Sequence, residues 1–466
     1  MDARSSARIG CSRAPQSLLC RKGAATPLIR VSRLCLVLAI ACSAAAAQQP
    51  PGSSSPAAQA QPLSLQEALR LALRNHTSIS IAQQNVTSVR ARLTEAAATL
   101  APQVTAAANA SWSGVQRGFG GGGGPGAPVS STSTSHGALI SIKQLIYDSM
   151  QTPARIHQAR AGLQSARYGA TAVEQALLLQ VTTDYYSVLS AKSQLAVAQA
   201  NLQGAKEEEQ MVAARVEEGE AARKDLLAAQ AARAQAEVDV IAAGNAVQQA
   251  LAVLRNSMGI PQTSPLEPSD QLTVPPFDIA LEDATRQALS QRPEVLRGQA
   301  DLEQARLTWR LAKIQSGPVL GVTGSYDVQV DPSPVSRGFS VNAGLSFPVF
   351  DASLTRARVV EARTAYETAR LQLEQTRRDV ELQVKQAWLA ASEARARIDA
   401  AERAVASAQE NLDAATGSFE ASASILLEVT QARAALLQAQ SARVIALRDY
   451  NVALAQLRYA MGRMQP

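Results

Sequence analysis

Few side chains in this 466-residue sequence could carry out catalysis or hold a metal ion. The three histidines, His76, His136 and His157, lie far apart and lack the spacing of metal ligands. The glycine run 120–124 is not followed by the Lys-Ser/Thr pair of a phosphate-binding loop. Neither a nucleophile elbow nor a zinc-protease motif is present. We therefore predict no enzymatic activity, no cofactor and no metal site.

The remaining candidates are polar and charged residues at two bends within long helical patterns. The bends are 203 residues apart (428 − 225), and Glu428 occupies in the second bend the place of Asp225 in the first. An acid in the first turn of a helix is favoured by the helix dipole, which is the ordinary interpretation of both residues. A bend that occurs twice between long helices indicates the tip of a hairpin in a duplicated protein. An acidic run at 207–209 is typical of a solvated helix face.

The composition favours long helices over a compact globular domain. Ala, Gln, Arg, Glu and Leu dominate, and aromatic residues make up only 4%. Residues 1–47 carry basic side chains, a short apolar run and alanines suited to cleavage, so they are predicted to be a secretory signal peptide. Residues 48–62, rich in Gln, Pro, Ser and Ala, are predicted to be a disordered leader.

Removal of the signal peptide changes both the charge and the cysteine content. Residues 1–47 hold seven of the 45 basic and one of the 39 acidic residues, which leaves 38 of each and a net charge near zero. Nucleic acid is therefore not expected as a partner. All four cysteines also lie in this segment. Lipidation at Cys42 is an alternative to cleavage after Ala47, although the leucine usual in a lipidation motif is missing.

The chain contains two repeats, predicted at 63–258 and 279–463 and joined by a Pro-rich linker at 259–278. Leu65 corresponds to Leu281 and Pro102 to Pro318 at an offset of 216, whereas Tyr147 corresponds to Phe350 at 203. The 13-residue difference lies in the interval that holds the glycine run, which is predicted to be a surface loop. Each repeat has the order helix, strand, strand, very long helix, tip, helix.

Strands are predicted at about 103–117, 133–147, 319–330 and 338–348. Apolar residues alternate with polar ones in the second pair, as in Val328 and Val330 beside Asp327 and Gln329. Such strands fit either a half-buried sheet or a membrane barrel. Four strands cannot close a barrel and an open edge cannot lie in lipid, so a membrane location requires an oligomer.

The long helices carry a heptad seam, which indicates left-handed coiled-coil packing. In the second repeat it runs from Val380 to Leu412 with steps of four and three residues. Its counterpart in the first repeat is interrupted by the polar residues Asp184 and Glu209.

Taken in order, these elements resemble the TolC-like family of trimeric outer-membrane efflux channels. The resemblance covers roughly residues 63–464. It rests on the duplicated order of elements, on the two tips, and on the strand-to-helix junctions, whose matching residues are Tyr147 and Asp148 in the first repeat and Phe350 and Asp351 in the second.

The resemblance implies a mainly α fold with a small membrane β part. Three protomers would each give four strands to one 12-stranded β-barrel in the outer membrane, and the long hairpins would form a periplasmic α-barrel. The tips would dock to a periplasmic adaptor linked to an inner-membrane pump, in drug efflux or type I secretion. The channel itself would be passive, and outer-membrane lipid would surround its barrel.

The resemblance also assigns roles at the tips. Family channels narrow their pore with acidic rings, and the matching residues here are Glu428, which keeps the carboxylate, and Gln431, which does not. A tyrosine and an arginine that hold some family channels closed fall on Phe419 and Ser424, so a different closed state is expected. The residues expected at the adaptor contact are Arg215, Gly219, Asp225, Leu226, Phe419 and Ser422.

Two other classes of protein are considered as alternatives. One is a periplasmic coiled-coil adaptor or structural protein without a barrel, which would need only one hairpin. The other is an uptake porin, which the predominantly helical sequence disfavours. The exported substrate cannot be read from the sequence.

Overall fold

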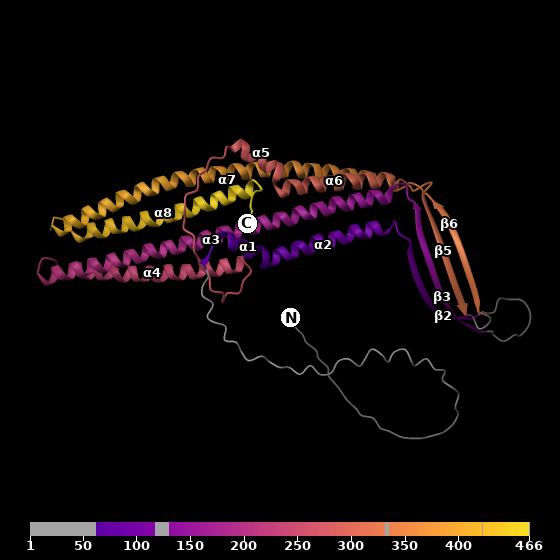
Figure 1. The fold of residues 1–466 in the computed structure, drawn as a ribbon, viewed down its shortest axis with the longest axis horizontal. Helices are drawn as coiled ribbons and strands as arrows, with labels where there is room; N and C mark the ends of the chain where they lie inside the picture. The colour runs from indigo at the N-terminus through magenta and orange to yellow at the C-terminus, as the bar shows by residue number, and fades with distance from the viewer. Residues whose placement is uncertain (1–61, 117–129, 331–334, 422, 466) are drawn as a thin grey trace, which may run out of the picture. The chain divides into compact units, whose positions relative to one another are not determined.

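The computed structural model describes residues 62–116, 130–330, 335–421 and 423–465 (Figure 1). The predicted signal peptide, nearly all of the leader, Cys42, the glycine run and Ser422 lie outside the described residues. The first repeat comprises β1 (Pro62–Leu63), α1 (Leu65–Asn75), α2 (Thr77–Ala98), β2 (Gln103–Gln116), β3 (Ser130–Tyr147), α3 (Gln151–Glu217) and α4 (Arg223–Ser257). The second comprises β4 (Glu267–Pro268), α5 (Leu281–Gln291), α6 (Pro293–Ile314), β5 (Val319–Val330), β6 (Ser336–Ser346), α7 (Leu354–Glu420) and α8 (Leu426–Ala460).

The two repeats match residue for residue in their helix boundaries. Helices α5 and α6 begin and end 216 residues after α1 and α2, and α7 and α8 begin and end 203 residues after α3 and α4. The duplicated fold predicted from the sequence is therefore confirmed.

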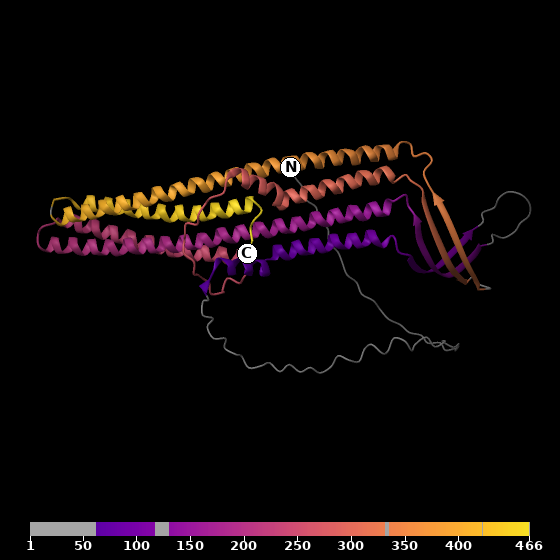
Figure 2. The same ribbon diagram turned by 45° about the horizontal axis from the view of Figure 1, so that its top comes forward.

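Each repeat contains a pair of short helices whose break is packed against the end of its last helix. The break falls at His76 in the first repeat and at Arg292-Pro293 in the second, where proline occupies the first turn of α6. Gly259 and Gly462, both with φ near +70°, follow α4 and α8 and leave no room for a Cβ beside His76 and Arg292. Stacked in this way, α1, α2 and α4 run beside the single helix α3 (Figures 1 and 2).

Helices α3 and α7, each of 67 residues, are the longest elements and span about 100 Å at 1.5 Å per residue. Helix α3 packs on α4 and α7 on α8, while α3 also contacts α6 and α8 (Figure 2). The predicted seam is buried from Val380 to Ile398, and Val181 and Val188 are buried at matching places in α3. Asp184 is also buried in this seam, where its Oδ1 accepts a hydrogen bond from Gln180.

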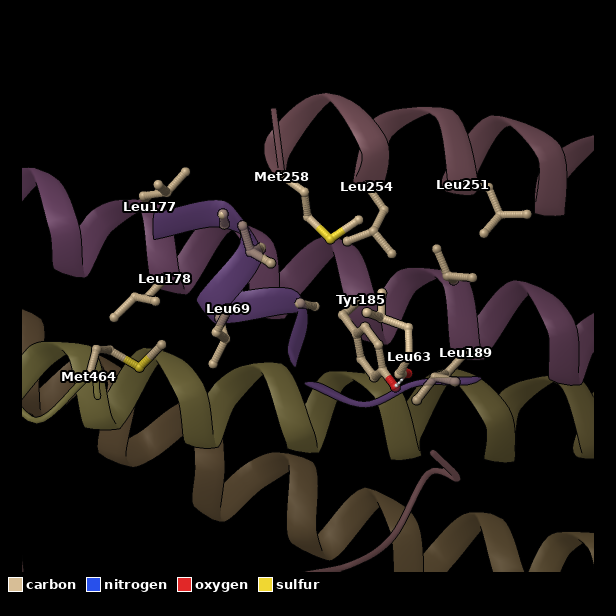
Figure 3. Packing of buried hydrophobic residues seen from close by; sticks show 14 of the residues in the cluster. Leu63, Leu69, Leu177, Leu178, Tyr185, Leu189, Leu251, Leu254, Met258 and Met464 are labelled. Carbon is tan, nitrogen blue, oxygen red and sulfur yellow. Dashed lines mark hydrogen bonds between the residues drawn. The ribbon is translucent and has the colours of Figure 1, made fainter. Parts of the chain in front are cut away.

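The largest apolar cluster lies where α1 packs on α3 beside the end of α4 (Figure 3). Tyr185 is fully buried there, and its hydroxyl shares its one proton between two acceptors, the carbonyl of Leu63 (2.8 Å) and Asp270 (2.9 Å). Burial and the hydrogen bond to Asp270 raise the pKa of Tyr185 above its ordinary value. Asp270 also accepts from the amide of Leu65, so the linker is fixed to the start of α1.

The four long strands form one antiparallel sheet in the order β2-β3-β5-β6. In the described part of the chain, β2 and β6 are its edges. Strand β3 starts three residues before its predicted limit, because Ser130 pairs with Gln116 through backbone bonds that require no apolar pattern. Strand β6 spans 336–346 instead of 338–348, since Pro348 has no amide to donate to a ladder. Strand β1 includes Pro62, which pairs with Glu267 of β4 in a second, short sheet.

None of the helices in the described ranges is both long enough and apolar enough to cross a membrane.

Candidate functional site at the two helical tips

The first tip, residues 215–226, reverses the chain between α3 and α4 around one glycine. Gly219 has φ of +80°, and its amide donates to the carbonyl of Val216 (3.2 Å). The amide of Glu220 donates to the carbonyl of Arg215 (2.8 Å). These two bonds form a Schellman motif, which satisfies the last carbonyls of α3 and requires a left-handed residue at this position.

The second tip, residues 418–431, reverses the chain between α7 and α8 and shares one of these two bonds. The amide of Ala423 donates to the carbonyl of Ser418 (2.8 Å), which matches the Glu220–Arg215 bond at an offset of 203. Ser422, which corresponds to Gly219, lies outside the described residues, so its predicted docking role stays a prediction.

The predicted acids occupy equivalent places in the first turns of α4 and α8. The amide of Asp225 donates to Ala222 (2.9 Å) and that of Glu428 to Ile425 (3.1 Å). Neither Ala222 nor Ile425 supplies a side-chain cap, so the two acids are the first-turn groups that compensate the helix dipoles. Glu428 and Gln431 are both exposed, whereas Asp225 is half-buried.

The two tips share one apolar cluster. Phe419 is 7% exposed and packs with other buried residues from α3, α4 and α8, which are Val212, Ala229, Leu426 and Val429. Leu226 of the first tip is partly buried against the same cluster. The second tip is therefore seated on the first through the side chain of Phe419.

Arg215 binds the second tip directly. Its guanidinium donates to the carbonyls of Phe419 (2.7 Å) and Glu420 (2.6 Å), and its Cζ lies 4.6 Å from the centre of the Phe419 ring. A cation at the last carbonyls of α7 also compensates the negative end of that helix dipole. Arg215 thus makes its strongest described contacts within the chain, and its role at an adaptor contact stays a prediction.

A buried ion pair that the sequence interpretation missed lies next to the tips. Glu208 is 5% exposed; it accepts hydrogen bonds from Arg433 Nε (2.8 Å) and from the hydroxyl of Thr430 (3.1 Å). The interpretation of 207–209 as a solvated face was wrong for Glu208. The signal was present in the sequence, because Ala205, Glu208 and Val212 follow the three-and-four spacing of a buried stripe.

Glu209 also has a partner, since it pairs with Arg233 of α4 at 3.0 Å. Only Glu207 of the acidic run is exposed. At the second position where the family's closing contact is expected, the Oγ of Ser424 is buried and has no hydrogen-bond partner among the described residues.

The strand-to-helix junctions are duplicated as closely as the tips. Asp148 accepts a hydrogen bond from the amide of Thr152, and Asp351 accepts from the amides of Ser353 (3.1 Å) and Thr355 (2.9 Å). Hydrogen bonding by Thr355 lowers the pKa of Asp351 below its ordinary value. Each aspartate therefore caps a long helix.

Two left-handed residues follow each of these aspartates, Ser149 and Met150 in the first junction and Ala352 and Ser353 in the second. Tyr147 and Phe350, which precede them, are exposed, and Phe350 is 86% exposed. Large aromatic side chains are therefore exposed on the surface at the point where the strands end.

The sheet has two chemically different faces. Register places Val104, Ile142, Gly324 and Val341 side by side, and Ala106, Ile140, Tyr326 and Phe339 in the next row. On the opposite face, hydroxyls pair across strands, as between Thr105 and Ser141 (2.7 Å) and between Ser325 and Ser340 (2.8 Å). Phe339 is 85% exposed, so the apolar face has no cover among the described residues.

A sequence profile for the family described as "Outer membrane efflux protein" matches residues 68–260 and 284–463, which is most of the chain and divides as the repeats do. The chain belongs to the outer membrane efflux protein family.

Individual relatives agree with this assignment. The chain is 25% identical over 343 residues to outer membrane efflux protein BepC of Brucella suis, which covers 72% of this chain and 74% of BepC. It is 24% identical over 394 residues to outer membrane protein TolC of Escherichia coli, which covers 80% of this chain and 77% of TolC. Its fold matches a crystal structure of CusC with a TM-score of 0.74 at 19% identity, and the match covers 85% of this chain and 92% of CusC.

Membership in the outer membrane efflux protein family confirms the predicted resemblance, the mainly helical fold with its antiparallel strands, and the location in the outer membrane with a periplasmic part. It supports an efflux or secretion channel over the coiled-coil adaptor considered as an alternative. In the described part of the chain, no group of three His, Cys, Asp or Glu side chains could hold a metal ion.

Proposed function

We propose that three copies of this chain form a passive exit duct across the outer membrane and the periplasm. The observation that carries the proposal is the four-stranded sheet with an uncovered apolar face and two edges that are unpaired in the described chain. An open edge is unstable in lipid because each unpaired backbone group costs several kcal/mol there. Edge-to-edge closure of three sheets gives a 12-stranded barrel with its apolar face toward lipid and its hydroxyl-rich face toward the lumen.

In this arrangement the helices extend from the barrel to the tips, because they join the strands at one end and reverse at the other (Figure 1). The exposed part of the first tip, which includes Glu217, Glu218 and Gly219, is available to a periplasmic adaptor. The adaptor links the duct to an inner-membrane pump, which selects the substrate and supplies the energy. The channel performs no catalysis.

The second tip forms the constriction. Three copies of Glu428 converge on the axis and make a ring of carboxylates, with Gln431 forming an uncharged ring one turn further along α8. Such a ring raises the local concentration of cations and makes the closed end cation-selective.

Fractionation and mass measurement test this function. The protein is expected in the outer-membrane fraction, and in detergent with a protein mass three times that of the mature protomer. Recovery as a soluble periplasmic monomer would reject the duct. If the protein is a trimer but shows no channel activity in planar bilayers, the proposed assembly stands and the proposed transport role is rejected.

A further inference from the structure

The first turns of α8 are bound to α3 by a buried polar cluster whose positions on α8 carry different residues in α4. Glu208 of α3 lies 2.8 Å from Arg433 Nε and 3.1 Å from Thr430 Oγ1. The Glu208 side chain is 6% exposed and that of Arg433 21%. In the first tip, the residues that correspond to Thr430 and Arg433 are Leu227 and Gln230, and both are exposed.

Gly204 makes this geometry possible. It lies one helical turn before Glu208, and a Cβ at Gly204 would overlap Nη1 of Arg433. Glycine in a helix interior is unfavourable relative to alanine, so its presence here has a local structural reason. The guanidinium of Arg433 occupies the space that the missing side chain leaves.

The cluster fixes the rotation of α8 about its axis. Successive residues of an α-helix are about 100° apart, which places Glu428 about 170° and Gln431 about 130° from the direction of Thr430 and Arg433. Holding Thr430 and Arg433 against α3 therefore turns Glu428 and Gln431 away from α3. Both are exposed, as this geometry requires.

We propose that Gly204, Glu208, Thr430 and Arg433 form a clamp that positions the constriction by setting the rotation of α8. Arg433 and Glu208 are positioning residues, since they act on the permeating ion only through Glu428 and Gln431. The inference rests on the proposed function, in which these two residues line the narrow end of the duct.

The variant Gly204→Ala tests the clamp without altering any charged residue. Alanine favours the helical state of α3, so if the cluster does not hold α8, the guanidinium of Arg433 moves aside and the trimer keeps wild-type stability and conductance. The clamp predicts a different result in planar bilayers. Displacement of Arg433 releases α8, which raises the single-channel conductance and shifts the reversal potential of a salt gradient toward zero.

Gly244→Ala is the matched control. Gly244 lies within α4, and a Cβ there meets no atom within 4 Å. This variant is expected to keep wild-type conductance and selectivity. The double variant Gly204→Ala/Arg433→Lys is expected to restore them, because lysine keeps a cation near Glu208 and lacks the Nη1 atom that alanine displaces.

The outcomes separate the clamp from the duct. If Glu428→Gln reduces cation selectivity and Gly204→Ala behaves like Gly244→Ala, the clamp is wrong and the constriction stands. If Glu428→Gln has no effect, the constriction itself is wrong. Should Gly204→Ala fail to assemble as a trimer, Glu208→Gln replaces it; unchanged selectivity of that variant would overturn the clamp.

Discussion

The two tips share a backbone hydrogen bond at the reversal but expose different side chains. Both reverse the chain with the same bond between residues five apart, and both place an acid in the first turn of the following helix. The first tip exposes the carboxylates of Glu217, Glu218 and Glu220. At the matching turn the second tip exposes Ala421, Ala423 and Ile425, and among its described residues exposed carboxylates occur only at Glu420 before the turn and Glu428 after it. Duplication has kept the reversal, which depends on backbone geometry, and has changed the exposed side chains around it.

The tips also differ in how they are held. The second tip is bound to the first repeat by Arg215, by Phe419 in the shared cluster, and by the Glu208–Arg433 pair. Two of these contacts involve charged groups of the first repeat acting on the second. The position of the second tip therefore depends on contacts with the first repeat.

The largest expected effect is the loss of the buried cation. Arg433→Met leaves Glu208 buried without its partner, which is expected to destabilise the start of α8 by about 3–5 kcal/mol. Hydrogen exchange of the α8 amides measures this loss. The control Gln230→Met, at the matching exposed position of α4, is expected to change stability by less than about 0.5 kcal/mol. Equal losses in the two variants would contradict the difference between the tips.

Phe419 provides the second test. Truncation of a buried phenylalanine costs about 3–5 kcal/mol, and we expect the lower end of this range because Phe419 lies in the last turn of α7. We expect Phe419→Ala to expose the second tip to proteolysis. Val216→Ala, at the equivalent but only partly buried position, is expected to have the smaller effect. The reverse order would show that the second tip is not seated through Phe419.

Replacing a glycine by alanine is expected to lower the stability of the trimer at the first tip and to raise it at the end of α7, before the second tip. Gly219→Ala places a Cβ on a residue with φ of +80° and should cost about 1–2 kcal/mol, although no atom lies within 4 Å. Gly417→Ala, in the helical end of α7 with equally open surroundings, should stabilise by up to about 1 kcal/mol. Thermal unfolding of the trimers measures both. A loss at both positions would mean that space, and not backbone conformation, limits the tips.

The smallest effect is expected for Arg215→Lys. Lysine keeps the charge at the end of α7 but cannot donate to two carbonyls in the planar geometry of a guanidinium, so we expect a loss of about 1 kcal/mol. Crosslinking to the cognate adaptor supplies the second measurement. Unchanged stability with abolished docking would assign Arg215 to the adaptor contact instead of to the second tip.

Much of this architecture could be predicted because it depends on periodic patterns and on turn residues. Local sequence preferences, present separately in each repeat, account for the helix breaks, the buried seam and the alternating strands. The breaks are at His76 and Pro293, and the seam runs from Val380 to Ile398.

The contacts between repeats could not be predicted in the same way. Glu208 looks like one acid in a run of three, and only the approach of α8 to α3 gives it a partner. The contacts of Arg215 with carbonyls of a helix more than 200 residues away also have no local signal in the sequence. The start of β3 was missed because backbone pairing continues through Ser130, where side chains give no alternating signal.

The most direct test of the central claim compares the two equivalent acids in one assay. Glu428→Gln and Asp225→Asn each remove one carboxylate from the first turn of a tip helix, at positions 203 residues apart. Reversal potentials of purified trimers in planar bilayers under a salt gradient report the cation selectivity of each channel. We predict that Glu428→Gln loses selectivity and that Asp225→Asn retains the wild-type value. Loss with Asp225→Asn and not with Glu428→Gln would place the constriction at the first tip and contradict the account.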